Sequence, residues 1–325
     1  MVRNHQINNL MKKLLSVLIL ATMAFSVLAT EQFNIRKDII TIVVPQGPGP
    51  ANTLCLKLGQ LMKEKGVTVL VVNKPGANKT IGTNFVANSE PDGRTLLVTS
   101  AADMALLPQV MPEVAKFNRT SFVPVMSLAG ATPVIAVRSN FPANNFKEFL
   151  DVIKKDTLQR QISMYSSNTK LIASAVYSLV GASPEIISYN SEDQALTDVA
   201  SGNLQAGIFT ANERLRAMAA TGKIKVLVSL TDKRDIRFQN IESISETYPN
   251  TKFQYWWGLY APADTPKSTI QELHQAFSEV WTDPRVVAEI DMLNLHKAEM
   301  TLPMLNTYLD STYKNLDLLA SKYLK

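Results

Sequence analysis

Residues 39–62 read IITIVVPQGPGPANTLCLKLGQLM and combine a strand, a loop and a helix in immediate succession. The β-branched run Ile39–Val44 predicts a strand, and the Gly/Pro-rich segment 45–50 predicts a tight loop. Apolar residues then recur at helical spacing after Asn52 and Thr53, either of which can cap a helix. The sequence therefore predicts a helix whose N-terminus opens toward the loop.

This predicted helix start has the features of an anion site. The first turn of a helix carries unpaired N–H groups and roughly half a positive charge, which suit a carboxylate or a phosphate. Gly47 and Gly49 would let the backbone approach such a ligand closely. An ordinary strand-to-helix turn has the same pattern, so this stretch alone leaves both interpretations open.

The composition is that of a folded globular protein with one large or two ordinary domains. The chain has 325 residues, of which 46% are apolar and 19% are charged. Its formal net charge is +5, but Arg3, Lys12 and Lys13 belong to a segment that we expect to be removed, which leaves about +2. No basic stripe is interleaved with aromatic residues, so nucleic acid is not an expected partner.

The N-terminal segment has the pattern of a secretory signal peptide. Two lysines precede the apolar segment Leu14–Ala29, which no charged residue interrupts and which ends with small residues at the cleavage-type positions. As a helix this run would span roughly 24 Å at about 1.5 Å per residue, less than a hydrocarbon core of about 30 Å. The prediction is a signal peptide over residues 1–29, and a retained membrane anchor is the alternative.

The order of predicted elements divides the mature chain into two α/β lobes. Strands and helices alternate over residues 39–99, and the order of strand, polar loop and helix recurs over residues 162–210. The run Phe253–Tyr260 then predicts a strand that returns to the first lobe. We expect lobe 1 over residues 30–129 and 252–325, and lobe 2 over residues 130–251. Ligands of open α/β sheets bind outside the carboxyl ends of the strands, so two such lobes would enclose one site between them.

No pattern for catalysis or metal binding is evident in the sequence. The histidines His5, His274 and His296 are scattered, the last two on expected C-terminal helices, and the single cysteine, Cys55, is expected to be buried. The chain has no G-x-S-x-G motif and no P-loop. We therefore predict no catalytic residue, no metal and no cofactor, and a hydrolase or transferase on a two-lobed fold remains an alternative.

Polar loops at the predicted strand ends supply hydroxyls, amides and backbone donors instead. They are residues 45–53, 77–80, 99–103, 166–170, 189–191 and Thr210. Three or four charge-assisted hydrogen bonds to a carboxylate give about 6 to 10 kcal/mol, whereas association costs about 4 to 15 kcal/mol. Because micromolar affinity needs about 8 kcal/mol net, one lobe alone would bind weakly. The expected mechanism is a clamshell in which both lobes close on a small acid.

Five segments follow one another in a distinctive order. They are VVPQGPGPANTL (43–54), NKPGANKTIGTNFVANSEPDGRTLL (73–97), ALTDVASGNLQAG (195–207), GKIKVLVSLTDKR (222–234) and WWGLYAPADTP (256–266). Together they resemble the periplasmic solute-binding receptors of tripartite tricarboxylate transporters, the Bug or TctC type. The resemblance covers nearly the whole mature chain.

The resemblance implies a type II periplasmic binding fold, with two α/β lobes and a central cleft. It also implies a periplasmic receptor, not an enzyme, that captures a small organic acid and delivers it to the membrane subunits of a tripartite tricarboxylate-type transporter; we expect a monomer. The ligand-binding positions carried onto this sequence are Gln46, Gly47, Pro48, Gly49, Asn52, Thr53, Thr99, Ser100, Ser166, Ser167, Asn168, Thr169 and Tyr189, to which the position of Thr210 is added.

The sequence departs from the family pattern at several positions. Pro50 stands where a second glycine is usual, and Thr53 replaces an acidic residue that could meet a ligand amine. Asn78 and Lys79 replace a second glycine pair. An acid with little amine character is therefore the expected ligand. Lys170 could add a cation in the cleft, and a solvated lysine at a helix start is the alternative.

A different functional class uses the same clamshell. A ligand-presenting partner of a two-component histidine kinase would regulate expression instead of feeding a transporter, and the sequence does not separate these roles. Neighbouring genes would separate them: two transporter membrane subunits favour transport, whereas an isolated gene beside a two-component pair favours signalling.

Overall fold

The computed structural model describes residues 33–323 with the exception of 236, 237, 250, 252, 254 and 294. The expected signal peptide, residues 1–29, lies outside the described residues. From Ile35 onward the chain forms one compact unit. In the part of the chain that is described, no helix combines the length and the apolar character that crossing a membrane requires.

A six-stranded mixed sheet forms the centre of the first lobe, in the order β11-β4-β10-β3-β1-β2. Its strands are β1 (Ile39–Val44), β2 (Thr68–Asn73), β3 (Thr95–Ser100), β4 (Phe122–Ala131), β10 (Tyr255–Pro262) and β11 (Leu295–Lys297). β1 pairs in parallel with β2 and β3, as the predicted crossovers require. β10 pairs antiparallel with β3 and β4, so the chain returns to the first lobe as expected.

A five-stranded mixed sheet forms the centre of the second lobe, in the order β7-β6-β8-β5-β9. Its strands are β5 (Pro133–Arg138), β6 (Gln161–Met164), β7 (Glu185–Ser188), β8 (Ala206–Thr210) and β9 (Ile224–Ser229). β6 is parallel to β7 and β8, while β5 is antiparallel to β8 and β9. The central strand β8 is buried along its whole length, which explains its continuous apolar pattern.

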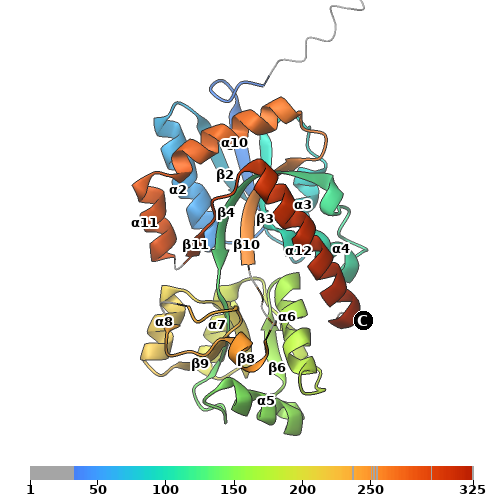
Figure 1. Cartoon of the computed structure of the whole chain (residues 1–325), viewed down its shortest axis with the longest axis vertical. Helices are drawn as coiled ribbons and strands as arrows, with labels where there is room; N and C mark the ends of the chain where they lie inside the picture. The colour runs from blue at the N-terminus through green and yellow to red at the C-terminus, as the bar shows by residue number, and fades with distance from the viewer. Residues whose placement is uncertain are drawn as a thin grey trace, which may run out of the picture. The chain divides into compact units, whose positions relative to one another are not determined.

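Helices cover both sheets. Those of the first lobe are α2 (Pro50–Glu64), α3 (Thr80–Ala87), α4 (Ala101–Val110), α10 (Lys267–Trp281), α11 (Pro284–Met292) and α12 (Leu302–Tyr323). Those of the second lobe are α5 (Phe146–Lys155), α6 (Ser167–Ser178), α7 (Glu192–Ser201), α8 (Glu213–Ala220) and the short α9 (Ile244–Thr247). Two 3-10 helices are Arg119–Ser121 and Thr157–Gln159. Figure 1 shows the two sets of elements one above the other, which is the predicted architecture of two α/β lobes.

The helix after β1 begins earlier than its capping pattern predicts. α2 starts at Pro50 with Gly49 as its N-cap and no side-chain cap, so the expectation that Asn52 or Thr53 caps it is wrong. Proline suits the first helical position because its fixed φ is helical and its missing N–H would be unpaired there anyway. Thr53 instead donates its hydroxyl to the carbonyl oxygen of Gly49 at 3.2 Å.

The chain passes from one lobe to the other at Thr132, between β4 and β5. The buried Thr132 hydroxyl donates to Oδ2 of Asp235 at 2.8 Å, and Nε2 of His296 lies 2.8 Å from the same hydroxyl. Asp235 follows β9 of the second lobe and His296 belongs to β11 of the first, so side chains from both lobes hold the crossing. His296 lies in a strand rather than in the expected helix because β11 pairs with β4 at the sheet edge.

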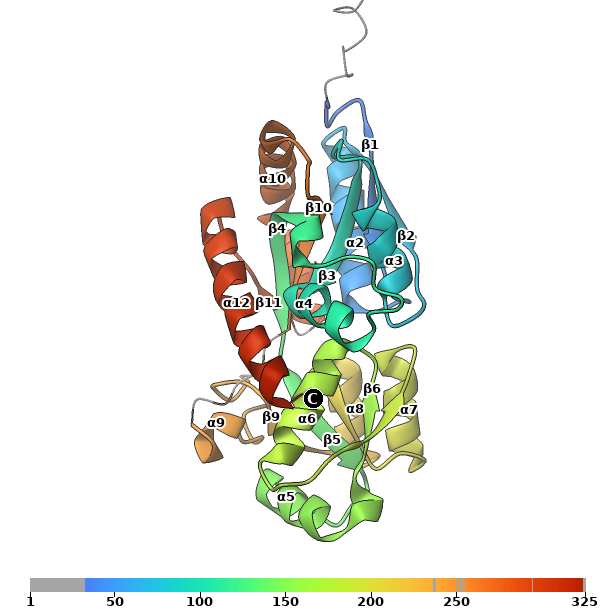
Figure 2. The ribbon, with the colours of Figure 1, turned by 90° about the vertical axis from the view of Figure 1, so that its right-hand side faces the viewer.

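Apolar side chains join the lobes along α12. They form a buried cluster of Ala102, Ala105 and Leu106 from α4, Leu171 from α6, and Leu316 and Ala320 from α12. Figure 2 shows α12 passing α4 of the first lobe and reaching α6 of the second. The C-terminal helix therefore packs against both lobes.

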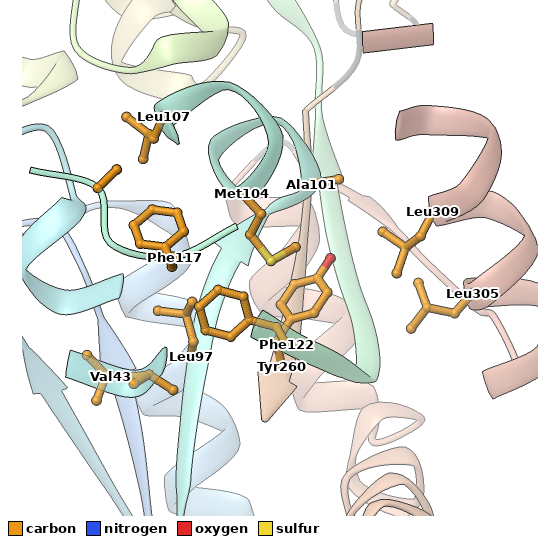
Figure 3. Close-up of a cluster of buried hydrophobic side chains, with 12 residues drawn as sticks. Val43, Leu97, Ala101, Met104, Leu107, Phe117, Phe122, Tyr260, Leu305 and Leu309 are labelled. Atoms are coloured by element: carbon orange, nitrogen blue, oxygen red, sulfur yellow. The ribbon is translucent and has the colours of Figure 1, made fainter. Parts of the chain in front are cut away.

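The core of the first lobe fixes the carboxyl ends of β1 and β3. Val43, Leu97, Met104 and Tyr260 belong to one buried cluster, to which α12 adds Leu305 and Leu309 (Figure 3). Burying a large apolar side chain contributes about 1.5–3 kcal/mol relative to leaving it exposed. This packing fixes the ends of β1 and β3, after which the polar loops begin.

Cys55 lies on the buried face of α2, and complete burial raises the pKa of its thiol to about 12. We expect the native protein to resist a thiol-specific reagent at about pH 8, since the nucleophilic thiolate is disfavoured and inaccessible. The reagent should label the single thiol once urea unfolds the chain. Native labelling as fast as that of the unfolded chain would contradict this burial.

Candidate ligand-binding cleft

A cavity of about 660 Å³ lies between the lobes, at the loops that follow the strands of both sheets. The expected site residues that line it from the first lobe are Gln46, Gly47, Pro48, Gly49 and Ser100. Those that line it from the second lobe are Ser166, Asn168, Tyr189 and Thr210. Asn52, Thr53, Thr99 and Thr169 lie outside the lining, and the side chain of Ser167 is outside the described part.

The N-termini of several helices converge on this cavity. The N-cap residues of α2, α3, α4, α6, α7 and α8 all line it; they are Gly49, Lys79, Ser100, Ser166, Ser191 and Asn212. Four of these side chains, Ser100, Ser166, Ser191 and Asn212, accept hydrogen bonds from backbone N–H groups and so fix the helix starts. Because each helix start carries roughly half a positive charge, their convergence favours an anion.

Asn168 offers the clearest side-chain donor to a ligand. It lies in the first turn of α6 and lines the cavity, although only 6% of it is exposed. Its Nδ2 is buried, and no described group accepts a hydrogen bond from it. Leaving such a buried group unsatisfied costs about 1–3 kcal/mol, so a ligand oxygen at this position would be favoured.

Several hydroxyl groups that were expected to bind the ligand form hydrogen bonds within the walls of the cavity instead. Thr169 donates its hydroxyl to the carbonyl oxygen of Ser166 at 2.7 Å, and the Ser166 hydroxyl accepts from the Thr169 N–H at 3.2 Å. The Tyr189 hydroxyl donates to Oδ2 of Asp198 at 2.9 Å. Burial, with a further contribution from Asp198, raises the pKa of Tyr189 to about 12. These three hydroxyls therefore all have hydrogen-bond partners within the protein.

Lys79 and Asp103, which are not among the ligand-binding residues expected from the sequence, form a buried ion pair in the first-lobe wall of the cavity. Nζ of Lys79 lies 2.7 Å from Oδ2 of Asp103, which also accepts a hydrogen bond from the Ser100 hydroxyl at 2.9 Å. The two charged side chains are only 11% and 2% exposed. The S-x-x-D spacing of Ser100 and Asp103 is itself a helix-start signal, and α4 begins directly after Ser100 where a polar loop over 99–103 was expected.

Glu192 also lines the cavity, although it is not among the ligand-binding residues expected from the sequence. Its carboxylate oxygens accept from the Thr210 N–H at 2.6 Å and from the Thr210 hydroxyl at 3.0 Å. Burial, with a smaller contribution from Asp193, raises the pKa of Glu192, whereas the bonds from Thr210 and Tyr165 act in the opposite direction. Asp193 lines the cavity as well and pairs with Arg214. The Thr210 hydroxyl is thus engaged by the protein.

Other candidates from the sequence do not line the cavity. Lys170, His274 and His296 are not among its lining residues. The described residues contain no group of three or more histidine, cysteine, aspartate or glutamate side chains arranged to hold a metal ion.

Comparison with known proteins gives concordant matches. The model of the family described as "Tripartite tricarboxylate transporter family receptor" matches residues 56–316. A UPF0065 protein of Bordetella pertussis is 28% identical over 256 residues, which cover 76% of this chain and 78% of the relative.

Solved structures agree in fold at lower identity. The periplasmic binding protein BugD superimposes with a TM-score of 0.79 at 23% identity, covering 88% of this chain and 98% of BugD. MatC from Rhodopseudomonas palustris with bound malate gives a TM-score of 0.78 at 21% identity, covering 87% of this chain and 98% of MatC. The two-lobed arrangement described above is therefore that of periplasmic binding proteins.

Proposed function

Because the chain belongs to the tripartite tricarboxylate transporter receptor family, whose members are periplasmic binding receptors and not enzymes, we propose that it captures a small carboxylate between its lobes. It acts in the periplasm after removal of residues 1–29 and delivers the acid, as a monomer, to the membrane subunits of a tripartite tricarboxylate-type transporter. Lobe 1 comprises residues 30–129 and 252–325, and lobe 2 comprises residues 130–251.

The observation that carries this proposal is the convergence of six helix N-termini on one cavity that also contains the buried Nδ2 of Asn168. A carboxylate is small enough to meet donors from both lobes and accepts several hydrogen bonds at once. The cavity volume of about 660 Å³ is within the range typical of small-molecule sites, about 300–1,000 Å³. The malate bound to MatC is an acid of the kind proposed here.

The ligand carboxylate is held mainly by backbone N–H groups of the loop over residues 46–49 and of the first turn of α6. Asn168 adds the side-chain donor, and Pro50 leaves the first turn of α2 with one backbone donor fewer. Gln46, Asn52, Thr53, Thr99, Ser100, Ser166, Ser167, Thr169, Tyr189 and Thr210 complete the proposed site, several of them by holding the helix starts in place.

Isothermal titration of the mature protein against mono-, di- and tricarboxylates tests the proposal. We expect at least one acid of about four to six carbons to bind with a dissociation constant near the micromolar range, because both lobes contribute donors. Neutral amides of the same acids should bind at least tenfold more weakly, since they lose the charge-assisted hydrogen bonds. Absence of binding by every acid at millimolar concentration would contradict the function.

A further inference from the structure

We propose that Lys79 contacts a second anionic group of the ligand, so that the cleft selects dicarboxylates over monocarboxylates. This inference rests on the proposed function and names the class of acid that the cleft takes. It concerns a residue that stands outside the binding positions carried over from the family pattern.

Lys79 is the one cationic side chain among the described residues that line the cavity. Three carboxylates line it too, and each has a donor from the protein: Asp103 has Lys79 and Ser100, Glu192 has Thr210, and Asp193 has Arg214. The acids of the wall are therefore satisfied without a ligand. A second carboxylate of the ligand has one cation to pair with in this wall.

Lys79 lines the cavity from a turn with an unusual backbone conformation. The residues Ala77, Asn78 and Lys79 have φ values of 44°, 52° and 73°, in the left-handed region, and Lys79 is the N-cap of α3. The N–H and the hydroxyl of Thr83 both donate to the Lys79 carbonyl oxygen, at 3.2 and 2.9 Å. Lys79 therefore lines the cavity from a turn that is anchored to the start of α3.

The ammonium group of Lys79 can donate further hydrogen bonds in addition to its ion pair with Asp103. It has three N–H donors, and Asp103 is its single partner among the described residues. Asp103 also keeps the Ser100 hydroxyl as a donor, so it remains partly satisfied when the ammonium is shared with a ligand carboxylate. Lys79 can therefore bridge Asp103 and the ligand.

Because Lys79 is paired with Asp103, the preference for dicarboxylates depends on direct contact between the ligand and the Lys79 ammonium group. A neutral ion pair produces little net field at a distance, so a ligand gains from Lys79 only by touching its ammonium group. A charge-assisted hydrogen bond of this kind corresponds to roughly a ten- to hundredfold change in affinity. This distinguishes Lys79 from a lysine that attracts anions only through its charge.

The test compares dicarboxylates with monocarboxylates of equal chain length, from four to six carbons, by isothermal titration. The key variant is Lys79→Met with Asp103→Asn, which removes the pair but leaves the net charge of the cavity unchanged. We expect the native protein to bind its best dicarboxylate at least tenfold more tightly than the matching monocarboxylate. In the double variant the ratio should fall to about threefold or less, while monocarboxylate binding persists and shows that the protein is folded.

Two further variants serve as controls. Lys79→Arg keeps the charge and the donors, so it should retain most of the preference. Lys170→Met removes the same charge from a lysine that does not line the cavity, and the preference should be unchanged. A tenfold preference that survives in the double variant, or equal binding of both acids by the native protein, would overturn the role of Lys79. Failure of every acid to bind would instead overturn the proposed function.

Discussion

Replacing Asn168 by aspartate is expected to weaken carboxylate binding by at least about a hundredfold. The substitution is nearly isosteric, but it exchanges the buried Nδ2 donor for an acceptor and places a negative charge beside the ligand. The lost charge-assisted hydrogen bond alone is worth about 1.5–3 kcal/mol, and repulsion between two carboxylates adds to it. Isothermal titration with the best acid measures the change, and a thermal melt verifies folding.

Asn190→Asp is the matched control for this substitution. Asn190 also lines the cavity, but its side chain is exposed, so solvent screens an added charge there. We expect a loss of less than about tenfold, because no buried donor is removed. Equal losses in the two variants would mean that net charge, rather than the Asn168 donor, governs binding.

Gly82→Ala is expected to lower the free energy of unfolding by about 1–3 kcal/mol. A Cβ atom at Gly82 would lie 2.8 Å from the carbonyl oxygen of Lys74 and 2.9 Å from the Cα of Pro45. These are backbone atoms, so α3 would have to move away from the loop that follows β1. Since Pro45 and Lys79 both line the cavity, binding should weaken as well. Urea unfolding and titration measure the two effects.

Gly59→Ala provides a control with the opposite expected sign. Gly59 lies inside α2, and a Cβ there would meet Val69 no closer than 3.5 Å, which is ordinary contact. Removing a helical glycine without a clash should raise the free energy of unfolding by about 0.5–1 kcal/mol. If both variants shifted stability in the same direction, close packing of α3 against the Pro45 loop would not explain the effect at Gly82.

Local patterns predicted the strands well because each is a short apolar run between clear turn signals. β1 occupies the predicted residues Ile39–Val44, and the run predicted at Phe253–Tyr260 contains most of β10. Either of the adjacent Asn144 and Asn145 could cap a helix that begins at Phe146, and the structure shows that Asn145 caps α5 through its side chain. The short strand β11 escaped prediction because it forms only through pairing with β4.

The sequence alone could not show which partners the charged side chains of the cleft contact. Lys79 and Asp103 are separated by 24 positions, and Glu192 and Thr210 by 18, so their contacts depend on how the strands and helices are stacked. The polar loop pattern did locate the cleft, because strand ends meet at one edge of each sheet. It could not show which hydroxyls would cap helices and which donors would remain for a ligand.

A crystal structure of the mature protein with its best-binding acid would show which groups hold the ligand. We expect a carboxylate between the lobes, with an oxygen about 3 Å from Nδ2 of Asn168 and others facing the N–H groups at the starts of α2 and α6. An acid bound on an outer surface, or held in the cleft with no oxygen near Asn168 or these helix starts, would refute the proposed binding site.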